Sequence, residues 1–262
     1  MRQLFSWPDW HLSLCGHLGF TLRTRGIRVA PAFMRGLRAL FITDVHAVSR
    51  TTDGDLRAFM EKLSAIEPDI LLLGGDYADE AANARRFFEA LAVLRPPLGC
   101  FGVLGNNDRE AWPEVGELRE VMAAAGCRLL VNEAECVALP GGELVVSGID
   151  EFKYGAPEME RALLPRRADR CRILLSHFPV VPEPMPELVL SGHTHGGQFN
   201  FLGLTPYTIG FELLFQRTVR LERFSGMASI GGGQLLVSKG IGASRIPVRA
   251  GVRPEIELLA FL

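Results

Sequence analysis

The chain has 262 residues, of which 48% are hydrophobic and 22% are charged, and its net charge at pH 7 is −2. This length and composition are typical of an ordinary globular protein, and we expect one large domain rather than two. The near balance of acidic and basic residues gives no indication of a nucleic-acid partner.

Cysteine usage and the absence of targeting signals favour a cytoplasmic location. The five cysteines are odd in number and contain no CxxC pair, which argues against a disulfide framework and against a thiolate zinc site. No run of 18 apolar residues and no signal-peptide core is present in the sequence. Aromatic residues near the N-terminus leave peripheral attachment to a membrane as an alternative. We expect residues 1–37 to form an arm packed on a domain of residues 38–262.

Short apolar strands alternate with amphipathic helices from residue 38 onward. Strands are predicted at 38–43, 69–73 and 99–104, and helices at 56–66, 80–94 and 113–125. Because these strands are apolar without alternation, we expect both of their faces to be buried. Further strands are predicted at 128–131, 136–139, 144–149, 172–175, 187–190, 218–224, 234–238 and 255–261, with a short helix at 157–164. The segment before residue 38 is expected to be irregular, and the chain as a whole to be α/β.

Five of the predicted strands are followed by a loop that carries Asp, His or Asn. In open α/β sheets such loops converge at the carboxyl ends of the strands. Each residue has an ordinary structural explanation, such as a turn carboxylate or a core histidine. Four of the six histidines lie in these loops, however, and this favours a metal site. The seven candidate ligands are Asp44, His46, Asp76, Asn106, His177, His193 and His195.

These loops read DVH, GGDYAD, GNND, SHFP and SGHTHGGQ, from about residue 40 to residue 198. The series resembles the calcineurin-like metallophosphoesterase superfamily, whose pattern is DxH, GDxxD, GNH[DE], a lone His and GHxH. The tail at 237–245 and 253–256 is similar to the bacterial branch with the HTHGGQ ending. The resemblance implies a four-layer αββα sandwich of two mixed β-sheets flanked by helices. It also implies one metal ion on Asp44, His46, Asp76 and His195, and a second on Asp76, Asn106, His177 and His193, with Asp76 as the bridge.

Two divalent cations in such a site generate a hydroxide at neutral pH and bind the phosphoryl oxygens that it attacks. The nitrogen and oxygen ligands suit Mn, Fe or Zn equally well. Asp79 lies three residues after Asp76 and is expected either to orient a ligand histidine or to cap the following helix.

The sequence departs from the family pattern at Asn107, where a histidine usually follows the ligand asparagine. A carboxamide cannot release a proton near pH 7, so a substrate with a good leaving group, such as a pyrophosphate or an activated diester, is favoured. The UDP-2,3-diacylglucosamine hydrolases of the superfamily also replace this histidine, with arginine. Arg109 is the candidate for a compensating positive charge, and a solvated loop charge is the alternative.

The leading hypothesis is therefore a dinuclear metal-dependent phosphohydrolase acting on a phosphodiester or pyrophosphate bond of a small-molecule, nucleotide-sugar or lipid-linked substrate. The apolar stretch at 199–215 is interpreted as core packing or as a lid for an acyl chain. Arg245, Arg249 and Arg253 are interpreted as ligands of substrate phosphate or as solvated charges. The alternatives are a nucleotide or cyclic-nucleotide phosphodiesterase and a catalytically weakened metal-binding scaffold. Nothing in the sequence indicates an oligomeric state.

Overall fold

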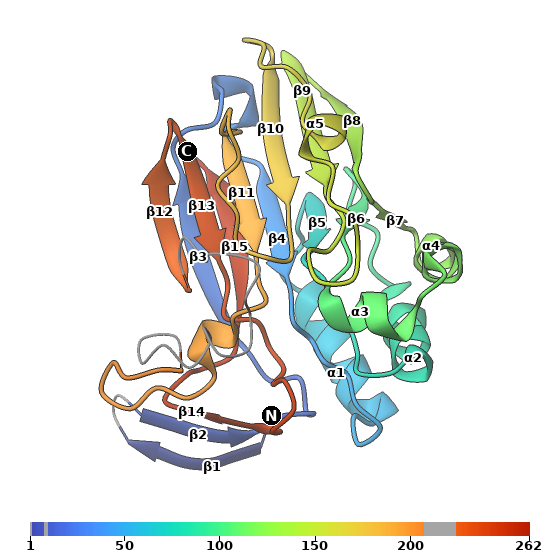
Figure 1. The fold of residues 1–262 in the computed structure, drawn as a ribbon, viewed down its shortest axis with the longest axis vertical. Helices are drawn as coiled ribbons and strands as arrows, with labels where there is room; N and C mark the ends of the chain where they lie inside the picture. Colours follow the sequence, from blue (N-terminus) through green and yellow to red (C-terminus); the bar gives the residue numbers. More distant parts are fainter. Residues whose placement is uncertain (1, 8–9, 207–223) are drawn as a thin grey trace.

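Two six-stranded β-sheets pack face to face in the computed structural model, which describes residues 2–7, 10–206 and 224–262 (Figure 1). The first sheet has the order β3 (Thr21–Ile27), β15 (Glu255–Phe261), β4 (Arg38–Ile42), β5 (Ile70–Leu73), β6 (Cys100–Gly102) and β7 (Cys127–Leu129). The second has the order β12 (Gly226–Ile230), β13 (Gly233–Val237), β11 (Leu188–Ser191), β10 (Arg170–Leu175), β9 (Gly142–Gly148) and β8 (Glu133–Leu139).

Each sheet contains a central run of parallel strands. In the first sheet β4, β5, β6 and β7 are parallel, and β15 runs antiparallel to β4. In the second, β9, β10, β11 and β13 are parallel, and the edge strands β8 and β12 are antiparallel to their neighbours. Because parallel strands end at the same edge of a sheet, each sheet gathers the loops that follow these strands in one place.

The space between the sheets is filled by apolar side chains from both. Phe41 and Leu72 of the first sheet belong to the same buried cluster as Val146 and Ile173 of the second. The strands that supply them have no polar face: all four residues of Ile70–Leu73 are buried. The prediction that these apolar runs are buried on both faces is therefore confirmed.

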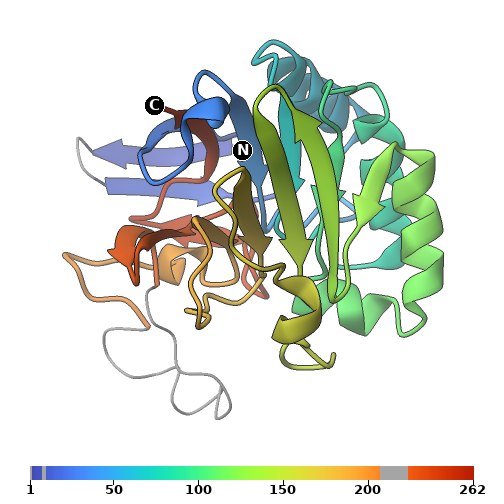
Figure 2. The same ribbon diagram turned by 90° about the horizontal axis from the view of Figure 1, so that it is seen from above.

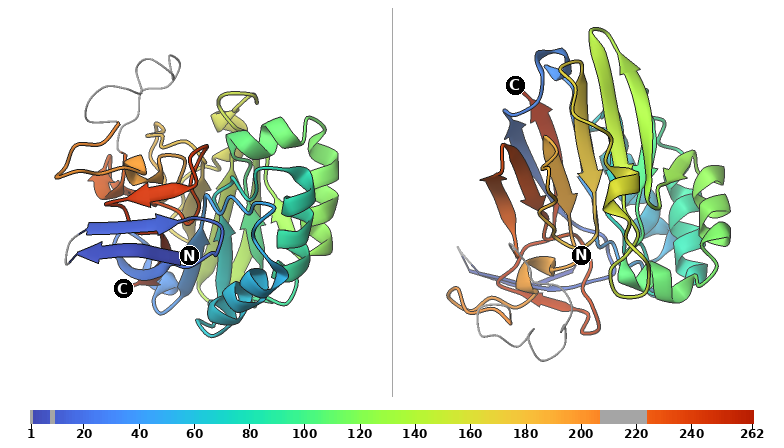
Figure 3. Two further views of the ribbon diagram at one scale, coloured as in Figure 1. Left: turned by 90° about the horizontal axis from the view of Figure 1, so that it is seen from below. Right: turned by 45° about the horizontal axis from the view of Figure 1, so that its top comes forward.

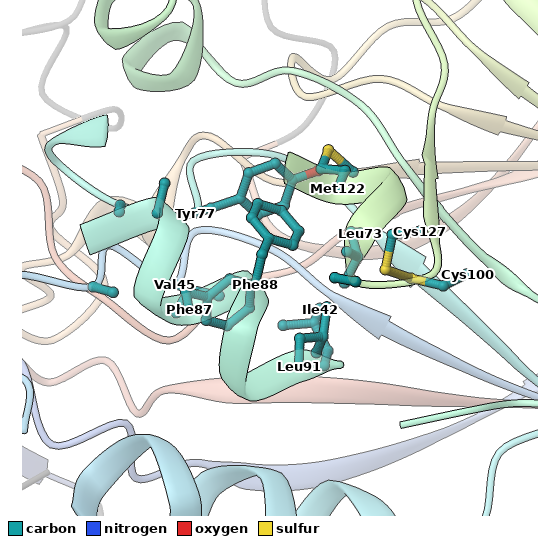
Figure 4. Packing of buried hydrophobic residues seen from close by; sticks show 14 of the residues in the cluster. Ile42, Val45, Leu73, Tyr77, Phe87, Phe88, Leu91, Cys100, Met122 and Cys127 are labelled. Carbon is teal, nitrogen blue, oxygen red and sulfur yellow. A yellow bond between two sulfur atoms is a disulfide. The ribbon is translucent and has the colours of Figure 1, made fainter. Parts of the chain in front are cut away.

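Helices α1 (Asp53–Ser64), α2 (Ala81–Leu91) and α4 (Val115–Ala124) cover the outer face of the first sheet (Figure 2). Phe87 and Phe88 of α2 pack with Tyr77 over this face (Figure 4). Helix α1 begins after Thr52, whose hydroxyl and Asp55 form a reciprocal capping box, so the helix starts three residues before the predicted start at residue 56.

The outer face of the second sheet is covered by the short helix α5 (Met159–Ala162) and by irregular chain (Figure 3). Leu174 and Val189 of this face form a cluster with Ala162 and Met185. The αββα architecture is thus confirmed, with a fourth layer that contains little regular helix.

The expectation of an irregular N-terminal segment was wrong. Strand β1 (Arg2–Trp7) pairs with β2 (Trp10–Leu14), which pairs with β14 (Val248–Ala250) in a third, small sheet. A 3-10 helix, η1 (Ala32–Met34), follows β3. The pairings of β2 with β14 and of β3 with β15 join segments more than 200 residues apart, so the local sequence carries little signal for them. Strands β12 and β14 were also not predicted, and the strand predicted at 218–224 lies almost entirely outside the described residues.

Cys100 and Cys127 form a disulfide between neighbouring parallel strands β6 and β7. The sequence argument against a disulfide framework missed this pair, because the two cysteines become register partners only when the sheet forms. Cys15, Cys136 and Cys171 are free thiols. No helix within the described part of the chain has the length and apolar character needed to cross a membrane.

Candidate metal centre

The seven candidate ligands lie in loops at the carboxyl ends of five strands. Strands β4, β5 and β6 deliver the loops of the first sheet, and β10 and β11 those of the second. Asn106 is the first residue of a short helix, α3 (Asn106–Ala111), and His195 begins a 3-10 turn, η2 (His195–Gly197). The two sheets thus contribute to one site from both sides.

Asp44, His46 and His195 form a first, fully buried cluster in which one ligand atom of each residue lies within 4.8 Å of the others. His195 Nε2 is 3.4 Å from Asp44 Oδ1. The Nε2 atom of His46 is buried and has no hydrogen-bond partner among the described residues. A buried nitrogen without a partner is costly unless another group, such as a cation, occupies the position that it faces.

Asp76 lies between this cluster and a second group of donors. Its Oδ2 atom is 3.4 Å from His46 Nε2 and 3.4 Å from His177 Nε2. His193 Nδ1 is 3.3 Å from His177 Nε2 and 3.0 Å from the side-chain oxygen of Asn106. The structure therefore brings all seven candidate residues into one continuous set of nitrogen and oxygen donors, with the carboxylate of Asp76 in the middle.

Two of the imidazoles are oriented by acceptors on their outer nitrogen. His46 Nδ1 lies 2.8 Å from Asp79 Oδ1, and His177 Nδ1 lies 2.8 Å from the carbonyl oxygen of Gly74. Because a carboxylate and a carbonyl only accept, Nδ1 carries the proton in both rings and the Nε2 lone pairs face the site. This is the tautomer that a divalent cation requires, so the donor set fits a metal. Asp79 has the orienting position that was expected for it.

The site also concentrates opposite charges. Burial alone would raise the pKa of Asp76, but His177 and His46 hold it well below its usual range. Burial alone would lower the pKa of His177, but Asp76 and Asp44 raise it to about 10. A proton and a metal cation therefore compete for the same position beside Asp76.

The backbone of the site adopts a conformation that most residues avoid. Five of the seven candidate ligands have positive φ angles: Asp44 (52°), His46 (43°), Asp76 (54°), His193 (67°) and His195 (51°). Each such residue costs on the order of 1 kcal/mol, and this strain persists only where the surroundings enforce it. The concentration of this strain at five candidate ligands, in three of the five ligand loops, indicates a functional site.

Glycines allow these loops to approach one another. A Cβ atom on Gly75 would collide with the backbone of Gly105, and one on Gly192 would collide with the carboxylate of Asp44. The loops after β5 and β6 are therefore packed backbone against backbone, and the loop after β11 is packed against the side chain of Asp44, which leaves no room for a larger residue at these glycines.

Asp108 holds the loop of Asp76 in place and was given no role by the sequence analysis. Its buried carboxylate accepts hydrogen bonds from the backbone N–H groups of Asp76 (2.6 Å), Tyr77 (3.0 Å) and Gly105 (2.8 Å). Its burial and the neighbouring charge of Asp76 raise its pKa. The signal for this residue was its position directly after the two asparagines of the GNND loop.

The tail segment after β13 also supports the site. The backbone N–H groups of Ile241 and Gly242 donate to the carbonyl oxygen of Asp44. A Cβ atom on Gly240 would meet the side chain of Asp44 at 2.5 Å. Gly240 and Gly242 therefore allow the segment to pack closely on the loop that carries Asp44 and His46.

Arg249 of β14 is fully buried, so the interpretation of this residue as a solvated charge was wrong. Its Nη2 atom lies 3.1 Å from His195 Nδ1. Burial lowers its pKa, but the ordinary value for arginine lies so far above neutrality that the guanidinium stays charged. Arg245 and Arg253 are exposed.

Asn107 lies at the site, whereas the contacts of Arg109 point elsewhere. The backbone N–H of Asn107 donates to Asp76 Oδ1 at 2.9 Å, and its Nδ2 atom is 3.3 Å from His46 Nδ1. Arg109 donates to the carbonyl oxygen of Pro113 and lies 3.8 Å from the carboxylate of Asp150. Neither partner of Arg109 is a candidate ligand.

Comparison with known proteins gives consistent matches. The model of the calcineurin-like phosphoesterase family matches residues 37–197. Phosphodiesterase YaeI of Escherichia coli is 29% identical over 239 residues, which cover 85% of this chain and 81% of that protein. An uncharacterized metallophosphoesterase of Aquifex aeolicus is 33% identical over 204 residues, covering 74% and 72% respectively. The solved phosphopantetheinyl hydrolase of Mycobacterium tuberculosis has 12% identity and a TM-score of 0.45, over 82% of this chain and 96% of that chain.

Substitution of Asp108 tests its supporting role. In Asp108→Ala three buried N–H groups lose their acceptor, so we expect a loss of about 3 kcal/mol or more in the free energy of unfolding. The bound metal should decrease in parallel, because the Asp76 loop is no longer fixed. Urea denaturation and elemental analysis of the purified protein measure both quantities. Glu110→Ala, an exposed change on the same helix, is the control, and equal behaviour of the two variants would contradict the role.

Proposed function

Because the chain belongs to the calcineurin-like phosphoesterase family, and so is a metal-dependent phosphoesterase, we propose that it hydrolyses a phosphodiester or pyrophosphate bond at the seven-residue site. The observation that carries the proposal is the position of Asp76, whose Oδ2 atom lies 3.4 Å from histidines of two different sheets. A carboxylate placed in this way is suited to bridge two cations.

In this proposal Asp44, His46, Asp76 and His195 hold one divalent ion, and Asp76, Asn106, His177 and His193 hold the other. When bound, the two ions lower the pKa of a water molecule and polarise the phosphoryl oxygens. The mixed nitrogen and oxygen donors suit Mn, Fe or Zn. The proposed ligands include no thiolate, and the lone pairs of their oxygen and nitrogen atoms face the site, which supports this choice of metals.

The chain's own residues favour an anionic substrate. Only two carboxylates, Asp44 and Asp76, are among the proposed ligands, so a pair of dications would leave the site with a net positive charge. The buried guanidinium beside His195 adds a further positive charge. Such a site attracts a phosphate group and holds it against the metal positions.

The proposal is tested with chelator-treated protein to which Mn²⁺ is returned. We expect hydrolysis of bis(p-nitrophenyl) phosphate to reappear with Mn²⁺, and Asp76→Asn to lower kcat by about a thousand-fold or more. Glu110→Gln, an exposed carboxylate change, should retain activity. Two bound Mn²⁺ ions without turnover would instead favour the metal-binding scaffold. Competition by soluble mononucleotides or cyclic nucleotides would favour the nucleotide phosphodiesterase.

Asn107 supports a substrate with a good leaving group. Its backbone N–H donates to Asp76 Oδ1 at 2.9 Å, which places the residue beside the proposed bridging carboxylate, but a carboxamide side chain cannot protonate an alkoxide. A phosphate or an activated alcohol leaves as a stable anion and does not require that proton. In this proposal Arg109 does not replace the missing acid, because its guanidinium contacts Pro113 and Asp150.

Introducing the missing acid should change the preference for leaving groups. In Asn107→His we expect hydrolysis of glycerol 2-phosphate, which has an alkoxide leaving group, to rise at least ten-fold relative to hydrolysis of ADP-ribose, which has a pyrophosphate bond. Steady-state kcat/KM values for the two substrates measure the ratio. Asn107→Gln keeps the carboxamide and is the control. A ratio that stays at the wild-type value in the histidine variant would contradict the leaving-group argument.

Exposed apolar side chains near the site favour a lipid-linked substrate as a second, more specific candidate. Phe201, Leu202 and Leu204 form a tight turn after η2, and their exposures are 53%, 103% and 63%. Leu202 at the tip has a φ of 54°, which is unfavourable for leucine. The neighbouring Ile246, whose carbonyl oxygen accepts from Gln198, is 56% exposed. Only residues 199–206 of the apolar stretch at 199–215 lie within the described part of the chain.

The turn should bind a lipid surface if this candidate is correct. We expect the wild-type protein to sediment with vesicles of phosphatidylglycerol and phosphatidylcholine, and Leu202→Asp to weaken this binding about ten-fold. Turnover of bis(p-nitrophenyl) phosphate should change less than two-fold. Val93→Asp, an exposed apolar position on another face, is the matched control. Equal vesicle binding by both variants would rule out the turn as a lipid contact.

A further inference from the structure

Arg249 places a buried positive charge against one of the proposed metal ligands. Its side chain is fully buried, and it donates to the carbonyl oxygens of Gly242 (2.5 Å), Lys239 (2.6 Å) and His195 (3.3 Å). Its Nη2 atom is also 3.1 Å from Nδ1 of the His195 ring. Among the described residues no carboxylate forms an ion pair with this guanidinium, and Asp44 and Glu255 act on it only from a greater distance.

The outer nitrogen of His195 faces a hydrogen-bond donor, whereas the outer nitrogens of His46 and His177 face acceptors. His46 and His177 face acceptors, the carboxylate of Asp79 and a carbonyl oxygen, and such partners increase the basicity of a ligand nitrogen. A guanidinium has only donors. The Nδ1 lone pair of His195 must therefore accept from Arg249, which withdraws electron density from the ring and weakens Nε2 as a donor to a cation.

The charge of Arg249 acts in the same direction. The first cluster contains a single carboxylate of its own, Asp44, whose Oδ1 atom lies 3.4 Å from Nε2 of His195. Arg249 contacts the other nitrogen of the same ring. A fixed cation in a buried environment repels a second cation much more strongly than it would in water, and salt screens this repulsion much less. In the second group of donors, the outer nitrogen of His177 instead faces the carbonyl oxygen of Gly74.

We infer that Arg249 lowers the affinity of the first metal position, the one formed by Asp44, His46, Asp76 and His195, so that the two positions fill unequally. This inference rests on the proposed dinuclear site. The position on Asp76, Asn106, His177 and His193 fills first, and the first position fills at a higher metal concentration. Arg249 is thus a positioning residue that acts through His195 and touches neither metal nor substrate.

A purely structural role for Arg249 makes the opposite prediction. The guanidinium joins β14 to the segment at 239–242, and that segment donates to the backbone of Asp44. If this connection were its only role, removing it would loosen the first cluster and weaken metal binding there. Whether replacement of Arg249 strengthens or weakens metal binding at the first position therefore distinguishes the two roles.

The test is a calorimetric titration of Mn²⁺ into chelator-treated, full-length protein. We expect two binding steps in the wild type, of which the weaker disappears in His195→Ala. In Arg249→Met the weaker step should tighten by about ten-fold or more, while the tighter step changes less than about three-fold. Arg249→Lys keeps the charge and should retain the unequal affinities. Arg253→Met removes an exposed arginine that follows the same strand and should leave both steps unchanged.

Three results would overturn the inference: a weaker step that loosens or stays unchanged in Arg249→Met, equal shifts in both steps, or an Arg249→Lys variant that behaves like Arg249→Met. If Arg249→Met does not give the wild-type circular dichroism spectrum, Arg249→Gln removes the charge, keeps two donors and carries the same expectation. A wild-type protein that binds one Mn²⁺ ion or none would overturn the dinuclear site as well. Two wild-type steps without a charge effect would overturn only the role of Arg249.

Discussion

The approach of His46 and His177 to a single oxygen of Asp76 is the interaction on which the rest of the structure depends. His46 follows a strand of the first sheet and His177 a strand of the second, so their common 3.4 Å distance to Asp76 Oδ2 requires the two sheets to be in register with each other. The apolar core between the sheets fixes that register. Packing far from the site thus determines whether the donors can share a cation.

The loops that carry the donors are held by groups that contribute no chemistry themselves. Asp108 fixes the backbone of Asp76, and the segment at 239–242 fixes that of Asp44. These contacts help to maintain the positive φ angles of Asp76 and Asp44, a conformation that would relax in an isolated loop. The metal site is therefore strained before any cation binds, and the surrounding fold supplies the energy that maintains it.

Much of the fold and the candidate ligands could be predicted from the sequence, for identifiable reasons. Strands such as β5 are continuous apolar runs, and each polar loop follows such a run, so local patterns sufficed. The pairing of β2 with β14, the pairing of β3 with β15, the disulfide between Cys100 and Cys127, and the burial of Arg249 depend on partners distant in the chain. Arg249 in particular has the sequence context of an exposed tail, and only the pairing of β14 with β2 brings it under the site.

Anomalous diffraction at the manganese edge, from crystals grown with Mn²⁺, tests the central claim most directly. The account predicts two peaks about 4 Å apart, one on each side of the carboxylate of Asp76, with His46 and His195 at one peak and His177 and His193 at the other. A single peak, or peaks that do not share Asp76, would contradict it.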